Sequence, residues 1–193
     1  LEIKLIAVSP NGTDIAVYET DGFSIHRVSE WNWKTLTRKN AKRFTDSIVS
    51  LEYSAKGTYL MAGTSSVDGM LFLDPKNKLT PLSVVKDFTG TVTVAKTGKT
   101  EKTVLMYSPQ GTLTYYNLAD GSKVQEFDCE TLLEQATLLY NNVYLVGTKN
   151  DSISIIKATT GEISATIPSK NPIILKSSGS DLHFVEFDEQ NDR

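Results

Sequence analysis

The sequence predicts an all-β fold, and three observations carry this prediction. Hydrophobic and polar residues alternate with a period of two in short runs such as 48–54, which is typical of half-buried strands. Turn residues separate the runs, as in Ala55-Lys56-Gly57 and Val67-Asp68-Gly69, where Asp-Gly favours a hairpin. The same arrangement then recurs along the whole chain without a convincing helix. We therefore expect antiparallel strands joined by tight turns.

The strands are expected to form units of four, taken here in chain order. The predicted units cover 3–37, 44–84, 91–128 and 136–168, followed by a half unit of two strands at 173–187. In the first unit the predicted strands are 3–8, 14–19, 23–28 and 32–37. The second unit contains the clearest pattern, and the others are variations on it.

The repeat has a measurable period. The residue that ends the turn between the second and third strands is Gly22, Gly69, Gly111 and then Asp151, at spacings of 47, 42 and 40 residues. Four-stranded blades of a β-propeller repeat every ~40–45 residues. The sequence therefore predicts that residues 1–193 form one partial β-propeller domain of about four and a half blades, belonging to a larger ring.

One unit also carries a recognisable motif. Residues of the second unit stand at the turn and strand positions of a WD40 blade: Asp46, Ser54, Gly57, Leu60, Gly63, Asp68, Gly69 and Asp74. The stretch thus resembles a degenerate WD40-type propeller, with Arg43-Phe44 in place of Gly-His and Leu73 in place of Trp. In the other units this Trp position is assigned to His26, Tyr116 and Ile156. Other propeller families have similar blades. The resemblance implies a protein-interaction platform.

Four and a half blades do not close a ring. Propellers close with about four to eight blades, and closure protects the sheet edges and the apolar blade faces. The chain begins at Leu1 and not at Met, which we interpret as a fragment or a processed chain. We expect the remaining blades to come from the same polypeptide or from a partner chain.

Composition limits the function classes. A net charge of −3, 39% hydrophobic residues and 22% charged residues are typical of a folded soluble domain. No apolar run approaches the ~18 residues that a membrane span needs. The single cysteine, Cys129, excludes an internal disulfide and fits a reducing compartment, so we expect a cytoplasmic or nuclear location.

Catalytic motifs are missing from the sequence. No His or Cys cluster has zinc spacing, no phosphate loop precedes a helix, and the two histidines, His26 and His183, lie on predicted strands. We therefore expect no enzyme activity, no cofactor and no metal. The alternative is a hydrolase or lactonase with a metal in the central channel, for which Asp21, Asp46 and Asp87 are the available ligands. Trp31 and Trp33 beside a turn indicate packing at a blade edge more than a recognition site.

One segment differs in charge from the rest. Residues 34–43 carry five cations and no acid, whereas the remaining chain sums to −8. We expect the connection from Arg38 to Asp46 to project Arg38, Lys39, Lys42 and Arg43 from one rim of the propeller. The segment is either a solvated connection or a contact for RNA, lipid headgroups or an acidic protein segment. The prediction is a non-catalytic scaffold within a larger intracellular complex, with these four residues contacting other protein subunits or RNA.

Overall fold

Antiparallel strands make up the regular structure of the chain. The computed structural model describes residues 1–65, 69–85, 94–97, 100–108, 110–139, 143–178 and 181–186, and every regular element in these ranges is a strand. Each of the first four sheets has four strands, which we call blades 1 to 4. Blade 1 contains β1 (Glu2–Val8), β2 (Asp14–Thr20), β3 (His26–Asn32) and β4 (Thr37–Phe44), and blade 2 contains β5 (Ile48–Tyr53), β6 (Leu60–Thr64), β7 (Met70–Asp74) and β8 (Thr80–Val85). Blade 3 contains β9 (Val94–Thr97), β10 (Thr103–Tyr107), β11 (Thr112–Asn117) and β12 (Lys123–Asp128), and blade 4 contains β13 (Gln135–Leu138), β14 (Tyr144–Thr148), β15 (Ser152–Lys157) and β16 (Ile163–Pro168).

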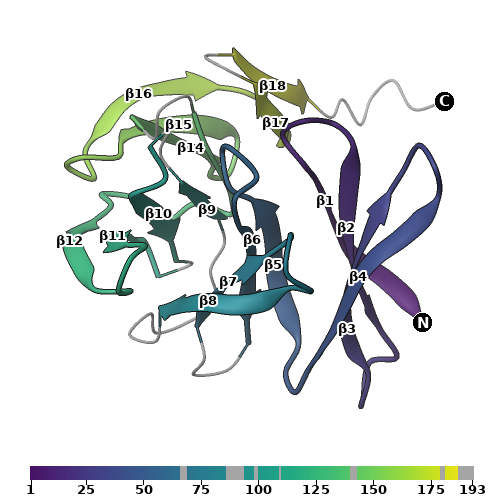
Figure 1. Ribbon diagram of the computed structural model, residues 1–193. Coiled ribbons are helices and arrows are strands. Elements are labelled where there is room, and N and C mark those ends of the chain that lie inside the picture. Colours follow the sequence, from purple (N-terminus) through teal and green to yellow (C-terminus); the bar gives the residue numbers. More distant parts are fainter. Residues whose placement is uncertain are drawn as a thin grey trace, which may run out of the picture.

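The four blades stand side by side around a common axis, as a propeller requires (Figure 1). Within each blade the strands follow one another as an antiparallel meander. The first strands of successive blades lie next to each other in the order β1, β5, β9 and β13, so they line the axis, and the fourth strands form the outer edge. A two-stranded sheet of β17 (Pro172–Ser178) and β18 (Asp181–Glu186) follows beside blade 4 as a half-blade. The predicted fold class of four and a half blades is confirmed.

The predicted strand boundaries of blade 1 were wrong in its second half. β3 begins at His26 and not at 23, because the Asp21 carboxylate accepts hydrogen bonds from the backbone N–H groups of the next residues and holds them in a turn. β4 occupies Thr37–Phe44, where the sequence predicted a connection. The preceding turn is stabilised by Asn32, whose side chain accepts from the N–H groups of Lys34 and Thr35. Blade 1 therefore extends from Glu2 to Phe44 and is longer than the predicted 3–37.

A β-bulge repeats at one position in all four blades. The register between the third and fourth strands shifts immediately before Trp31, Leu73, Tyr116 and Ile156. A bulge sets local twist and fixes the register of the strands around it. These four residues are structurally equivalent, and they lie 42, 43 and 40 residues apart. The sequence-based assignment of the Trp position to His26 is therefore wrong, because the equivalent residue in blade 1 is Trp31.

In the described part of the chain the hydrophobic core forms three layers, each between two neighbouring blades. Blades 1 and 2 enclose the first layer, which includes Ala16, Tyr18, Val28, Leu51, Tyr53, Leu60 and Leu73. Blades 2 and 3 enclose Met61, Met70, Phe72, Val104, Met106 and Tyr116, and blades 3 and 4 enclose Leu105, Tyr107, Leu113, Leu138, Leu145 and Ile156. The alternation along each strand thus supplies both faces of a blade, one for each neighbour.

Some predicted features lie outside the described residues. These are Asp68, Asp87, residues 91–93 at the predicted start of blade 3, and residue 187 at the end of the half-blade. The turn glycines that are described behave as predicted. Gly57 and Gly69 have φ values of 73° and 62°, the left-handed conformation that favours glycine.

Candidate partner-binding site: the basic edge strand and the adjoining groove

The four predicted partner-binding residues lie on a strand and not on a loop. Arg38, Lys39, Lys42 and Arg43 all belong to β4, the outermost strand of blade 1. Because β4 crosses the whole height of the sheet, these residues are spread along it and do not gather at one rim. The expectation of a rim loop was therefore wrong. Whether these residues bind a partner stays a prediction.

The cations of β4 project from both faces of blade 1. Cross-strand pairing places Arg38 opposite Trp31 and Arg43 opposite Arg27, on the face that points away from blade 2. Lys42 pairs with Val28, which belongs to the core layer toward blade 2, and so lies on the other face. The Arg38 guanidinium lies 5.9 Å from the centre of the Trp31 ring, and the Lys42 ammonium lies 5.9 Å from that of Phe44. Both contacts have cation–π geometry.

Charge distinguishes β4 from the other outer strands. β8 and β16 contain no charged residue, and β12 contains one cation and two acids. β4 contains four cations and no acid, and it is mostly exposed. In the described part of the chain only one of the four, Lys39, forms an ion pair. β4 is therefore the one strand among these four outer strands that carries a strong positive charge.

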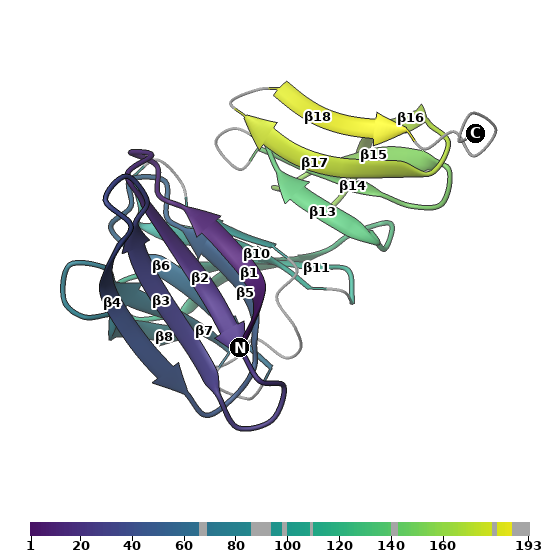
Figure 2. The same cartoon turned by 90° about the vertical axis from the view of Figure 1, so that its right-hand side faces the viewer.

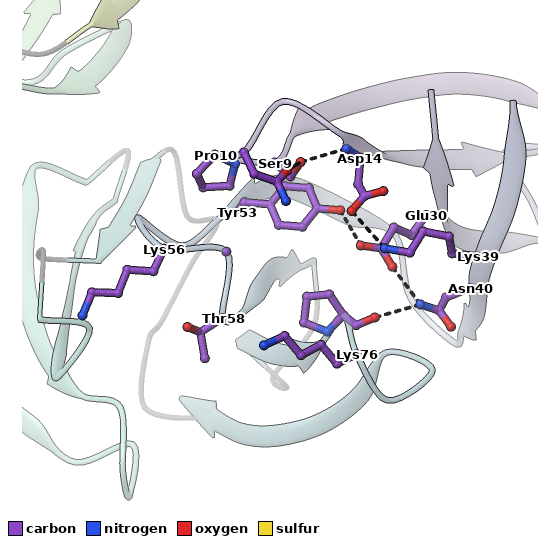
Figure 3. A pocket seen from close by; sticks show the side chains of 13 residues that line it. Ser9, Pro10, Asp14, Glu30, Lys39, Asn40, Tyr53, Lys56, Thr58 and Lys76 are labelled. Carbon is purple, nitrogen blue, oxygen red and sulfur yellow. Dashed lines mark hydrogen bonds and ion pairs between the residues drawn. The ribbon is translucent and has the colours of Figure 1, made fainter. Parts of the chain in front are cut away.

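A polar groove adjoins β4 on the side of blade 2. Its volume is about 660 Å³, and it opens between the β1–β2 turn, the β5–β6 turn and the segment that follows β7 (Figure 3). Its lining residues include Asp14, Glu30, Lys39, Asn40, Tyr53, Lys56, Thr58 and Lys76. The groove therefore combines two carboxylates, three ammonium groups and several neutral polar groups.

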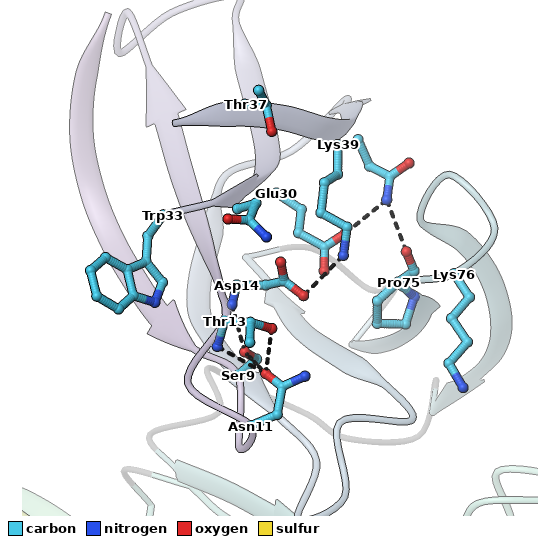
Figure 4. A network of polar contacts seen from close by, with 12 residues as sticks. Ser9, Asn11, Thr13, Asp14, Glu30, Trp33, Thr37, Lys39, Pro75 and Lys76 are labelled. Carbon is cyan, nitrogen blue, oxygen red and sulfur yellow. Dashed lines mark hydrogen bonds and ion pairs between the residues drawn. The ribbon is translucent and has the colours of Figure 1, made fainter. Parts of the chain in front are cut away.

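The floor of the groove is a hydrogen-bond network that joins the two blades. Glu30 is 1% exposed, and its two carboxylate oxygens accept hydrogen bonds from the Tyr53 hydroxyl at 2.9 Å and from Asn40 Nδ2 at 2.7 Å. Asn40, labelled in Figure 3, also donates to the backbone carbonyl of Pro75, labelled in Figure 4, at 2.8 Å. Burial, followed by the nearby Glu30 carboxylate, holds the pKa of Tyr53 far above its usual range. The tyrosine thus remains a hydrogen-bond donor at all ordinary pH values.

A second pair of charges lies beside this network. Lys39 Nζ donates to Asp14 Oδ2 at 2.9 Å, and Asp14 is 9% exposed. This hydrogen bond raises the pKa of Lys39. The Asp14 backbone N–H donates to Ser9 Oγ, and the Ser9 hydroxyl donates to Asn11 Oδ1, so the β1–β2 turn is tied to the same site. Among the described residues, Lys39 is therefore the cation of β4 that an ion pair ties to the rest of blade 1.

The sequence did not single out the residues of this network. Glu30, Asn40 and Tyr53 look like ordinary members of strands, and only the packing of blade 1 on blade 2 brings them together. Asp14 follows a turn, where an acid is common. No sequence pattern would have revealed these contacts.

The other candidate residues named from the sequence are His26, Trp31, Trp33, Cys129 and His183. His26 is 8% exposed, and its Nδ1 lies 2.8 Å from the Tyr18 hydroxyl, which confirms a packed blade residue. Trp31 is half-buried, whereas Trp33 is 47% exposed and donates its indole N–H to the Gly12 carbonyl. Burial raises the pKa of the half-buried Cys129 thiol to about 11. His183 lies on β18.

Of the carboxylates of the alternative metal hypothesis, Asp21 and Asp46 each make local hydrogen bonds, and Asp87 lies outside the described residues. Asp21 caps the β2–β3 turn, and Asp46 accepts a hydrogen bond from the Thr45 hydroxyl in the β4–β5 connection. Among the described residues no group of three His, Cys, Asp or Glu side chains has an arrangement that would hold a metal ion. The described ranges also contain no helix with the length and hydrophobicity of a membrane span.

The sheets, their order and their inter-blade cores define a β-propeller. Over residues 1–186 the chain matches a family described as an N-terminal beta-propeller domain, and it belongs to that family. A relative is an uncharacterized protein of Treponema pallidum (strain Nichols), 35% identical over 171 residues. The match covers 89% of the chain but only 28% of that relative's length.

A solved structure supports the fold alone. Kuenenia stuttgartiensis hydrazine synthase is similar with a TM-score of 0.68 at 14% sequence identity. The likeness covers 88% of this chain and 51% of that chain. The chain thus spans about half of this structural neighbour and less than a third of its T. pallidum relative.

Proposed function

We propose that this propeller is a non-catalytic, WD40-like interaction module within a larger intracellular assembly, and that β4 binds an acidic protein segment. The observation that carries the proposal is the position of four cations on one outer edge strand. An edge strand has a row of unpaired backbone N–H and C=O groups that an extended peptide can use. Cations on both faces of that strand would meet acidic side chains on both faces of an added strand.

An acidic protein segment fits this surface better than RNA does. A peptide strand uses the backbone edge as well as the charges, whereas single-stranded RNA is bound mainly through aromatic stacking and phosphate contacts. Trp31 on β3 and Phe44 at the end of β4 are half-buried and already contact Arg38 and Lys42. They offer no free aromatic platform for bases.

The outer strands of blades 2 and 4 have another means of edge protection. β8 and β16 each contain a proline, which hinders edge-to-edge pairing, and cations on β4 have the same general effect. Edge protection alone predicts no saturable binding of an acidic peptide.

Support for the WD40-like assignment comes from Trp31-Asn32, which occupies the register position of Leu73-Asp74 in blade 2.

The test is a charge-reversal experiment on the full-length protein. Arg38→Glu, Lys42→Glu and Arg43→Glu are combined, and Lys39 is left intact because it pairs with Asp14. The matched control reverses three exposed lysines on other blades, Lys102, Lys123 and Lys157, and so has the same net charge. The probes are a fluorescent peptide of alternating Glu and Val, and a single-stranded RNA of similar charge.

We expect the β4 variant to bind the acidic peptide about tenfold more weakly or worse, with salt weakening the wild-type complex. The control variant should bind like the wild type. An equal loss in both variants, or no saturable binding by the wild type, would contradict the proposal. Binding of the RNA but not of the peptide would replace the acidic segment by a nucleic acid.

A further inference from the structure

Blade 1 has an apolar face that no other described element covers. The face consists of Ile6 and Val8 on β1, Ile15 and Val17 on β2, and Trp31 on β3, which cross-strand pairing places on one side of the sheet. The exposure is greatest on β1, where Ile3, Ile6 and Val8 are 53%, 61% and 55% exposed. Ile15 and Trp31 are half-buried, and Val17 in the middle of the sheet is 6% exposed. Figure 2 looks onto this side of blade 1. We call the six residues Ile3, Ile6, Val8, Ile15, Val17 and Trp31 the open face.

The turn after the first strand gives the equivalent residues in other blades. The backbone N–H of Ser9, Ser54 and Leu139 each donates to the carbonyl of the residue five positions later, at 2.9 Å in all three blades. The residues just before these donors are therefore equivalent: Val8, Tyr53 and Leu138. Tyr53 is 7% exposed and Leu138 is 0% exposed, because each packs against the preceding blade.

The same comparison holds further along the first strand and on the third strand. Two residues before Tyr53, Leu51 is 8% exposed, whereas its equivalent Ile6 is 61% exposed. At the repeated bulge, Leu73, Tyr116 and Ile156 are at most 1% exposed, whereas Trp31 is half-buried. Blade 1 thus has the apolar side chains of a blade-to-blade interface at the right positions, without a blade against them.

We infer that a further β-sheet blade packs against the open face, and that the same polypeptide supplies this blade from beyond the residues of this structure. Each of blades 2, 3 and 4 receives the apolar face of the blade before it, and the open face continues this series of interfaces at β1. The lengths of the relatives favour the same chain as the source, since the chain matches 28% of the T. pallidum protein and 51% of the structural neighbour.

The polar part of the open face agrees with this occupant. Toward the outer edge, Arg27 Nε donates to Glu19 Oε2 at 2.9 Å, and Ser29 Oγ donates to the same oxygen. The pair is internally neutralised, so a sheet placed over it leaves no uncompensated charge. The proposed contact at β4 is also compatible, because β12 remains largely exposed, and β8 is exposed over Thr80–Leu82, although blades 2 and 3 have neighbours on both sides.

Cysteine labelling in the full-length protein tests the inference. In a background of Cys129→Ala, the variants are Ile6→Cys on the open face, Leu51→Cys at the equivalent buried position and Val124→Cys on β12, which is 59% exposed. We expect a maleimide reagent to label Ile6→Cys about tenfold or more slowly than Val124→Cys, at a rate near that of Leu51→Cys. Light scattering of the same samples gives the oligomeric state.

The outcomes separate the possible occupants. Protection of Ile6→Cys in a monomer, unchanged on dilution, supports a blade of the same chain. Protection that appears only in an oligomer and is lost on dilution means that a second copy covers the face, and it overturns the inference. Labelling as fast as that of Val124→Cys means that the face is open to solvent, which also overturns it. None of these three outcomes bears on the binding of an acidic peptide by β4.

Discussion

The hydrogen bond between Tyr53 and Glu30 should be a measurable part of the free energy of folding. Tyr53→Phe removes the donor at 2.9 Å from a carboxylate that is 1% exposed, and leaves one of its oxygens without this partner. Hydrogen bonds to charged groups contribute about 1.5–3 kcal/mol. For a domain of this size the loss corresponds to a decrease of about 3–12 °C in Tm. Thermal unfolding of the variant and the wild type measures it.

A double-mutant cycle with Glu30→Gln assigns the effect to this pair. In the neutral glutamine background the charge-assisted part is absent, so Tyr53→Phe should cost about 1 kcal/mol or less. The sign of the pH dependence follows from the raised pKa of Tyr53. The stabilisation is fully present below the unfolded pKa, near 10, and decreases as the pH rises above it. A cost of Tyr53→Phe below about 0.5 kcal/mol in the Glu30 background would refute the argument.

Three further predictions concern single sites. Gly57→Val should cost about 1–3 kcal/mol in urea unfolding because φ is 73° there, whereas the neighbouring Ala55→Val should be nearly neutral, and equal costs would contradict the conformational argument. The rate of Cys129 alkylation by iodoacetamide should rise with an apparent pKa of about 11, and a rate that levels off near pH 9 would show that burial does not raise this pKa. The stability contributed by the neutral thiol is fully present below pH 9 and is lost as the pH rises through about 11. Asp21→Ala should speed chymotrypsin cleavage after the 92% exposed Phe23, because three backbone hydrogen bonds to Asp21 are lost, and an unchanged rate would mean that Asp21 does not order this turn.

The repeat and the turns were predictable because they depend on local chemistry. Alternation with a period of two gives strands, and glycines such as Gly57 and Gly69 mark turns that need a positive φ. The boundary errors in blade 1 have a local cause as well. Residues 23–25 are apolar enough to continue a strand, but the capping carboxylate of Asp21 holds them in a turn.

The sequence did not identify β4 as a strand because of its many cations. β4 lies on the outer edge and has no fully buried residue, so its sequence lacks the apolar alternation that identifies inner strands, and a run of cations resembles a loop. The groove could not be predicted from the sequence for a different reason. Its contacts join Glu30 to Tyr53 across 23 residues and Asn40 to Pro75 across 35, and only the packing of blade 1 on blade 2 creates them.

Hydrogen–deuterium exchange on the full-length protein tests most directly whether β4 is a binding edge. Exchange is measured with and without the acidic Glu-Val peptide, and β12, another outer edge strand, serves as the internal reference. Binding at β4 predicts slower exchange of amides within Thr37–Phe44 and unchanged exchange within Lys123–Asp128. Unchanged exchange in β4 at a saturating peptide concentration, or equal slowing in both strands, would contradict it.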